Sequence, residues 1–220
     1  MRCITSRQIA MNLAQKCGPV LPFLPDEFRN DREIVITALS TYAYPYSTLG
    51  PSLQSEREVA LATASTAKVT RGTNMIGNIT LLPDKFKYDR DFVIEYLSRN
   101  GNQLYGLDPI NTQEDPILTQ FFKDREIVLA AVRSDGHAIR FAPDELKNDP
   151  EMIKAVLQQN GVLLCYWSPK SRYTVSGFSK EPSDNKEYVV IALKSNPRAY
   201  EYASDRLQAD LEIKRLAGIM

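Results

Sequence analysis

The chain has few of the residues on which chemistry at a protein site usually depends. Its 220 residues include one histidine, His137, and three cysteines that form no Cys-x-x-Cys pair. A single histidine cannot supply a histidine-based metal site, and an odd number of scattered cysteines does not make a disulfide framework. We therefore expect no metal, no cofactor and reduced thiols, as in a cytosol-like compartment.

Charge and hydropathy exclude further classes of protein. Lysine plus arginine and aspartate plus glutamate both number 27, so the formal net charge is zero and there is no general attraction to nucleic acid. No apolar stretch approaches the roughly 20 residues that a bilayer-spanning helix requires, and the first residues lack the apolar centre of a signal peptide. The stretch 71–78 has two glycines but lacks the Lys-Ser or Lys-Thr of a phosphate loop. These absences predict a cytoplasmic protein without membrane or nucleic-acid partners.

The sequence does contain an internal repeat. The segment DREIVLAAV, which begins at Asp124, has clear counterparts at Asp31, Asp89 and Asp149. Looser counterparts begin at Ser6, Glu56, Asn185 and Asp210. Successive anchor residues lie 25, 25, 33, 35, 25, 36 and 25 residues apart, so one spacing recurs and the longer ones accommodate insertions. A fixed period of this length is typical of a stacked repeat protein.

Each anchor has the properties of a helix N-cap. Aspartate, asparagine and serine side chains accept hydrogen bonds from the first turn, and an acid two residues later suits the positive end of the helix dipole. The expected capping residues with the best match are Asp31, Asp89, Asp124, Asp149 and Asp210. Gly101, Gly136 and Gly161 follow their anchors by twelve residues, where a glycine commonly ends a helix in the left-handed conformation. Each unit should open with a helix of roughly eleven residues.

The apolar residues predict how these helices pack. They recur three, four, seven and eight residues after the anchor, as on one face of an amphipathic helix. The seventh position holds a small residue in several units, which favours close approach by a neighbouring helix. A second, shorter helix should then start at Pro25, Pro83, Pro143 and Ser204. Because helices this short are unstable alone, we expect an all-α fold of stacked repeats of about 25 residues, similar to an α-solenoid, with irregular insertions.

The repeat also divides the chain. Helical repeats are expected in residues 1–61, 81–161 and 185–220, and the last of these ends in a capping unit. Two stretches interrupt them, a loop or degenerate repeat at 62–80 and an aromatic and basic insertion at 162–184.

The motif also points to a family. The run DREIVLAAV and the segments 138–161 and 199–212 resemble the repeats of the domain of unknown function 4116, whose units read roughly A-L-x-Y-A-S-x-E-L-x-x-D-R-E-V-V-L-x-A-V-x-x-N-G. The resemblance implies a helical repeat protein, often from protists or from bacteria that live inside other cells. It implies no catalytic residue. The resemblance is also compatible with a protein that is secreted into a host cell by a route that needs no signal peptide.

Aromatic and basic side chains gather in two segments that the repeat does not explain, 41–51 and 165–182. Tyrosine, tryptophan and arginine are enriched at binding hot spots, and loops on a rigid scaffold often carry recognition. The candidate binding residues are Tyr42, Tyr44 and Tyr46 in the first segment and Tyr166, Trp167, Lys170, Arg172 and Tyr173 in the second. The structural alternative is that these side chains only cover the core of the repeats.

Three functions remain open. The first is a non-enzymatic protein that binds a protein partner through the aromatic segments. The second is an enzyme-like effector with a pocket near residues 165–182, although His137 and Cys165 occupy positions that vary between repeats. The third is a weak RNA-binding repeat, since basic side chains lie beside aromatic rings that could stack on bases.

Overall fold

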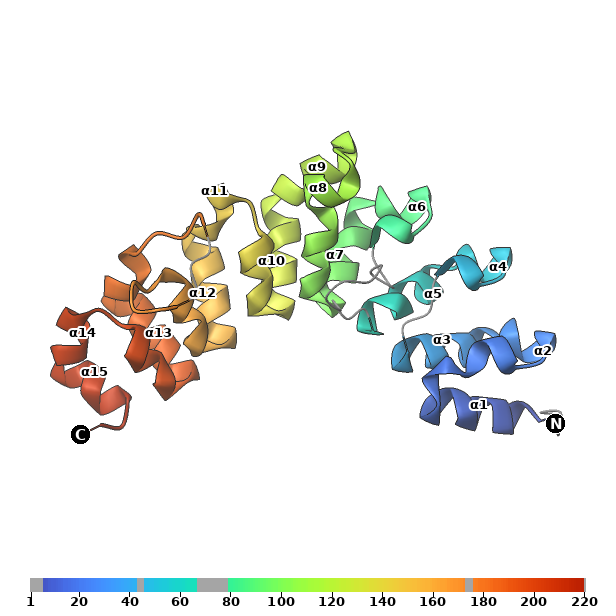
Figure 1. The fold of residues 1–220 in the computed structure, drawn as a ribbon, viewed down its shortest axis with the longest axis horizontal. Coiled ribbons are helices and arrows are strands. Elements are labelled where there is room, and N and C mark those ends of the chain that lie inside the picture. The colour runs from blue at the N-terminus through green and yellow to red at the C-terminus, as the bar shows by residue number, and fades with distance from the viewer. Residues whose placement is uncertain (1–5, 43–45, 67–78, 173–175, 220) are drawn as a thin grey trace.

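A computed structural model describes residues 6–42, 46–66, 79–172 and 176–219, and helices are the regular elements of these ranges, which contain no strand. The expected all-α class is therefore confirmed. Figure 1 shows the helices following one another in chain order along an arc, with the two termini at its opposite ends. This arrangement is compatible with the expected solenoid. No helix within the described ranges is long and apolar enough to cross a bilayer.

One helix begins directly after each anchor residue. Six of these helices have ten residues and two have six, so they are close to the expected length. They are α1 (Arg7–Lys16), α3 (Arg32–Thr41), α5 (Arg57–Ala62), α7 (Arg90–Arg99), α10 (Arg125–Ser134), α12 (Pro150–Gln159), α13 (Lys186–Ser195) and α15 (Leu211–Leu216). The repeat read from the sequence is thus a repeat of helices.

The aspartate anchors act as N-caps, as expected. In each case the side chain accepts hydrogen bonds from the backbone N–H groups two and three residues later, and Asn185 does the same for α13. The capping aspartates are Asp31, Asp89, Asp124, Asp149 and Asp210. Ser6 and Glu56, which match the motif more loosely, make no such side-chain hydrogen bond. An N-cap of this kind stabilises a helix by about 1 kcal/mol.

After the long helix, most units contain a 3-10 helix that the repeat motif does not predict, and four units also contain the expected short α-helix. The 3-10 helices are η1 (Gly18–Phe23), η5 (Gly101–Leu107), η6 (Gly136–Phe141), η7 (Gly161–Trp167) and η9 (Pro197–Tyr202). The short helices start after Pro25, Pro83, Pro143 and Ser204 and are α2 (Asp26–Arg29), α6 (Asp84–Lys87), α11 (Asp144–Lys147) and α14 (Asp205–Ala209). The remaining elements are η2 (Tyr46–Thr48), α4 (Pro51–Gln54), η3 (Thr63–Thr66), η4 (Ile79–Leu81), α8 (Pro109–Thr112), α9 (Pro116–Lys123) and η8 (Glu181–Asp184).

The expectation that the glycines end the helices in the left-handed conformation is wrong. The residues that precede these glycines and end α7, α10 and α12, namely Asn100, Asp135 and Asn160, are extended, and the described glycines with positive φ are Gly177 and Gly218. The repeat glycines instead allow close contact between units. A Cβ atom on Gly101 would lie 2.0 Å from the carbonyl oxygen of Ala131, and one on Gly161 would lie 1.9 Å from that of Ala192.

These contacts explain the small residues at the seventh position of the motif. Ala131 and Ala192 occupy that position in α10 and α13, and the preceding unit's glycine packs directly on their backbone. A side chain on either partner would separate the helices. The expected close approach of neighbouring helices is confirmed at these two junctions.

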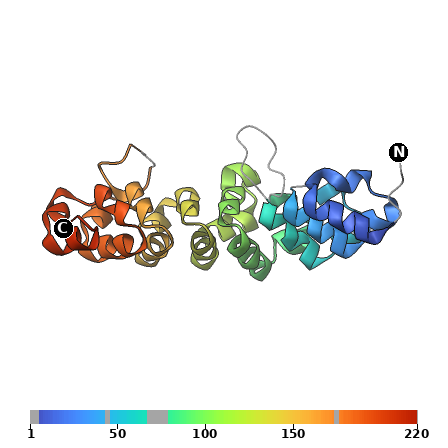
Figure 2. The same ribbon diagram turned by 90° about the horizontal axis from the view of Figure 1, so that it is seen from below.

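The units form two layers around one continuous core. Figure 2 views α10 and α12 nearly end-on along one side of the stack, and the second halves of the units cover the other side. The residues three, four, seven and eight after the anchors are almost all buried between the layers, among them Ile127, Ile153 and Val189. A single cluster of buried side chains runs from α1 to α15. Each unit is therefore stabilised by its neighbours, which is the energetics expected of a repeat protein.

The two interruptions differ in what the structure describes. Most of the 62–80 stretch lies outside the described residues, which resume in η4. In the 162–184 stretch, η7 occupies the first part and η8 the last. The described chain without helix in this stretch therefore comprises residues 168–172 and 176–180, and Tyr166 and Trp167 belong to the regular part of their repeat.

Candidate functional site

Two of the candidate binding residues are core residues. Tyr46 is 3% exposed and its hydroxyl donates to the Gln54 carbonyl oxygen at 2.8 Å. Trp167 is 1% exposed and its indole N–H donates to the Lys147 carbonyl oxygen at 3.2 Å. Neither side chain is offered to a partner, so for these two residues the structural alternative holds.

The other candidates do not form one site. Tyr42, 45% exposed, ends α3 near the N-terminal end of the arc, whereas η7 and its neighbours lie toward the C-terminal end (Figure 1). Lys170 forms an ion pair with Asp205 at 2.8 Å, and Arg172 is exposed. Tyr44 and Tyr173 lie outside the described residues. Tyr166, by contrast, lines a pocket.

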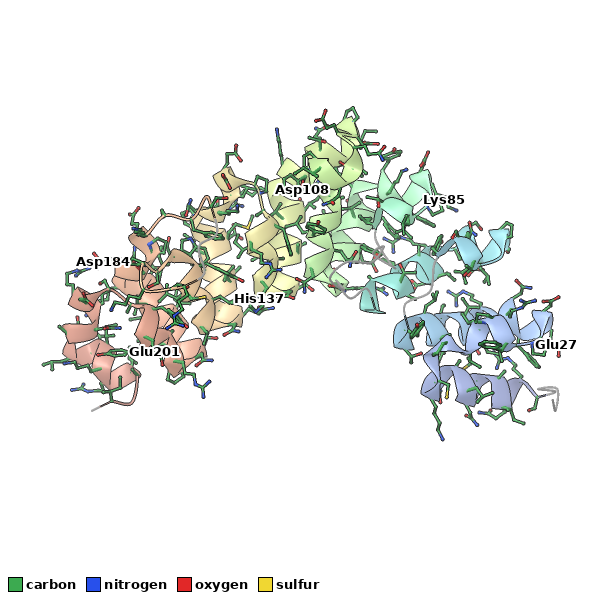
Figure 3. The ribbon with its side chains drawn as sticks, viewed as in Figure 1. Glu27, Lys85, Asp108, His137, Asp184 and Glu201 are labelled. Carbon is green, nitrogen blue, oxygen red and sulfur yellow. The ribbon has the colours of Figure 1, made fainter. Side chains whose placement is uncertain are left out.

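This pocket of about 640 Å³ extends across three consecutive repeats, over η6, η7 and η9. We call it the η6–η7–η9 pocket. It is lined by His137, Arg140, Phe141, Asn160, Val162, Leu163, Cys165, Tyr166 and Tyr202. Figure 3 places His137 near the inner edge of the arc, opposite Lys85 on the outer edge.

The repeat itself positions these side chains. Phe141, Tyr166 and Tyr202 each lie five residues after the first residue of their 3-10 helix, and His137 and Val162 each lie one residue after it. Because consecutive units stack in register, equivalent positions come to lie next to one another. The pocket is therefore built from an aromatic row that the second layer of the stack creates.

A polar contact joins two of these repeats. The ring Nδ1 of His137 lies 2.9 Å from the hydroxyl of Tyr166, and the two rings meet edge to face with centroids 6.2 Å apart. The start of η6 is held by Asp135, whose carboxylate accepts the backbone N–H of His137 at 2.9 Å. These contacts fix the positions of His137 in η6 and Tyr166 in η7 relative to each other.

The insertion after η7 supports this wall from behind. Phe178 stacks on Tyr166 with ring centroids 5.4 Å apart and meets Trp167 edge to face at 5.2 Å. The loop is attached to the end of α11, because Asn148 donates to the Gly177 carbonyl oxygen at 2.7 Å and accepts from the Ser179 N–H at 2.9 Å. Gly177 has a φ of 85°, and a Cβ atom there would lie 2.2 Å from an oxygen of Asp144.

The ionisable groups of the pocket include a thiol and a phenol whose pKa values burial raises. Burial raises the pKa of the Cys165 thiol, so the thiol is protonated at neutral pH and is a poor nucleophile. Burial also raises the pKa of the Tyr166 phenol, an effect that the nearby Arg140 guanidinium partly offsets. The described lining residues include no aspartate or glutamate that could act as a general acid or base. Nor do any three histidine, cysteine or acidic side chains of the described ranges converge on a metal-sized position.

A second hollow, of about 410 Å³, lies at the N-terminal end between η1, α2 and η2. Its lining residues include Leu21, Asn30 and Leu49, together with Asp26 and Arg29, which form an ion pair with each other. The only cation of its lining is therefore already neutralised within the repeat.

Most charged side chains of the long helices form ion pairs with a neighbouring repeat. The repeat motif alone did not predict these pairs. The first residue of a helix is often arginine, and its guanidinium reaches the capping aspartate and the first-turn glutamate of the next helix. The rungs of this ion-pair ladder are Arg7 to Asp31 and Glu33, Arg32 to Glu56, Arg90 to Asp124 and Glu126, Arg125 to Asp149 and Glu151, and Lys186 to Asp210 and Glu212. The signal was present in the sequence, because a cation follows most anchors.

The family comparison agrees with the repeat. Three segments of the chain, residues 6–54, 124–172 and 185–217, match the family described as "Domain of unknown function (DUF4116)", and together they cover more than half of the chain. No curated protein and no solved structure matches the chain. The second matched segment contains η6 and η7, and the third contains η9, so all three helices of the pocket lie within family repeats.

Proposed function

The chain belongs to the DUF4116 family, and we propose that it is a non-enzymatic helical-repeat protein that binds a segment of a partner protein in the η6–η7–η9 pocket. The proposal rests mainly on one observation, a pocket in which aromatic side chains and an arginine converge without any acidic lining residue among those described. Tyrosine and arginine are the side chains that most often carry binding energy at interfaces.

The scaffold around the pocket supports this function. Leu164 and Trp167 lie fully buried behind the wall. An ion-pair rung joins the units of α10 and α12, and the contact of Gly161 with Ala192 joins the units of α12 and α13. A rigid pocket loses little conformational entropy when it binds, which favours affinity. The proposed place of action is the cytoplasm, including that of a host cell that the protein enters as an effector. That setting rests on the family resemblance alone.

The test blocks the pocket and compares it with a matched change on the opposite layer. Val162→Lys places a charge on the pocket wall, whereas Ala155→Lys places the same charge on the exposed surface of α12, away from the pocket. Both positions are half-buried, so the two variants are comparable in their effect on folding. Circular dichroism and thermal unfolding verify that each variant is folded.

Partner binding is then measured by affinity purification from cells of the source organism or its host, followed by titration of the purified partner. We expect the wild type and Ala155→Lys to bind the same protein and Val162→Lys to lose it. Retention of the partner by folded Val162→Lys would show that the pocket is not the binding site.

A further inference from the structure

Arg140 differs from Arg90 and Arg125 in having no acidic ion-pair partner among the described residues. Arg90 and Arg125 each reach two carboxylates of the next repeat, at 2.6 to 3.1 Å. No ion pair joins Arg140 to any acidic residue within the described ranges, although it lies in the same stack of repeats. Its guanidinium lies over the ring of Phe141, with the central carbon 4.7 Å from the ring centroid.

Asp135, an acidic residue near this pocket, forms no ion pair with Arg140 within the described residues. Asp135 acts on Tyr166 of the same pocket, but its carboxylate is already occupied by two hydrogen bonds. It accepts the backbone N–H of His137 at 2.9 Å and the side-chain amide of Asn102. The pocket therefore has a guanidinium group that forms no ion pair within the described residues, beside a largely apolar wall.

The polar atoms of the pocket lie beside apolar surface. Arg140, His137 and the Tyr166 hydroxyl form the polar part, and Phe141, Val162, Leu163 and Tyr202 form the apolar part. An arginine guanidinium is planar and binds a carboxylate through two parallel hydrogen bonds. A ligand that fills both parts must present a carboxylate and an apolar group at neighbouring positions.

We propose that the η6–η7–η9 pocket recognises a protein segment in which an aspartate or glutamate lies next to an apolar side chain, and that Arg140 binds the carboxylate. This inference rests on the proposed function and adds the chemistry of the partner. The apolar side chain packs on Phe141, Leu163 and Tyr202, and the carboxylate binds Arg140 beside the Tyr166 hydroxyl.

The inference is tested on the full chain with three pools of fluorescent nonapeptides in a glycine and serine background. Each peptide carries one leucine or phenylalanine flanked by two glutamates, two glutamines or two lysines, and binding is measured by fluorescence anisotropy. We expect the glutamate pool to bind about tenfold more tightly than the glutamine pool, because a hydrogen bond to a charged group contributes this order of affinity. The lysine pool should bind least.

Two variants locate the preference. Arg140→Gln should reduce the preference for glutamate over glutamine to within about twofold while binding of the glutamine pool persists. Arg198→Gln is the matched control, because Arg198 is an exposed cation of η9 that does not line the pocket, and it should keep the full preference.

Each alternative result has a definite meaning. Equal binding of the glutamate and glutamine pools to the wild type overturns the inference, as does a glutamate preference that survives Arg140→Gln. If one of these two results occurs and Val162→Lys still abolishes the binding of both pools, the pocket remains the binding site and only the carboxylate assignment fails. If no pool binds although the protein partner still requires Val162, the inference fails while the proposed function stands.

Discussion

The two junctions that α12 forms with its neighbouring helices, α10 and α13, are held together by different contacts. Toward α10, Arg125 binds Asp149 at 3.0 Å and Glu151 at 2.8 Å, and Gly136 packs against the side-chain ends of Gln159 and Leu163. Toward α13, the equivalent of Arg125 is Pro150, which has no charge. There the contact of Gly161 with the backbone of Ala192 replaces the ladder.

The difference shows that the ion-pair ladder and the glycine contact are independent of each other. The α7–α10 junction has both, because Arg90 binds Asp124 at 2.8 Å and a Cβ atom on Gly101 would lie 2.0 Å from the Ala131 oxygen. A surface ion pair contributes little to stability, whereas a backbone contact without space for a Cβ atom is a strict geometric condition. The glycine contact should therefore dominate where both are present.

The largest expected effect comes from filling the backbone contact. Gly161→Ala places a methyl group 1.9 Å from the Ala192 oxygen, so the helices must separate, and we expect destabilisation of about 3 kcal/mol. Thermal unfolding should show a Tm lower by roughly 6–12 °C for a chain of this size. Gly136→Ala is the control, because its nearest neighbours are the side-chain ends of Gln159 and Leu163, at 2.7 Å. Similar Tm values for the two variants would contradict the comparison.

The caps should rank next. Asn185→Ala removes the hydrogen bonds to the N–H groups of Glu187 and Tyr188 and should destabilise the protein by about 1 kcal/mol. Asp149→Ala removes an equivalent cap and also the partner of Arg125, so its loss should be somewhat larger. Urea unfolding of both variants measures the difference. An Asp149→Ala effect no larger than that of Asn185→Ala would mean that the ladder adds nothing there.

Lowering the pH should distinguish the aspartate caps from the asparagine cap. The Arg90 guanidinium holds the folded-state pKa of Asp124 below its usual value, and Lys186 does so for Asp210. A depressed folded-state pKa gives stability that is full above the unfolded pKa of about 3.9 and is lost as the pH falls through the folded value. Asn185 does not titrate. Amide exchange at the start of α10 and α15 should therefore accelerate below about pH 4 more than at the start of α13. Uniform acceleration would refute this assignment.

The smallest effect should come from building the missing rung. Pro150→Arg with Asn185→Asp recreates the Arg125–Asp149 pair one junction later. A double-mutant cycle should show favourable coupling smaller than the contribution of a cap, because the pair is exposed and α12 already reaches α13 through Lys154 and Glu187 at 2.7 Å. Coupling as large as the Gly161→Ala effect would reverse our ranking of the two devices.

Local rules were enough to predict the long helices and the short α-helices that follow Pro25, Pro83, Pro143 and Ser204. The capping aspartates, the amphipathic face and the prolines that precede short helices all act within about ten residues of chain. Asp124 and Pro143 therefore marked their helices correctly. The left-handed stops were wrong because Gly101 and Gly161 respond to a helix of the next unit, about 30 residues away.

Few of the residues that line the candidate site were predicted as binding residues. Tyr166 was named, but Arg140, Phe141 and Tyr202 were missed, because each belongs to a different repeat and has no distinguishing local pattern. Trp167 illustrates the opposite error, since an aromatic residue next to an insertion is equally compatible with a surface and with the core. Its burial depends on Phe178 and Lys147, which the folded loop and α11 bring to it.

The sequence alone determined that this chain is a row of capped helices, because hydrogen bonding at a helix end and apolar periodicity are local properties. Tertiary structure alone decided which charges are neutralised and which side chains remain open to a ligand, because both depend on the register between neighbouring repeats. Arg125 and Arg140 have the same charge in the sequence. Only the stacking gives one of them two carboxylates and places the other in a pocket lined by aromatic rings.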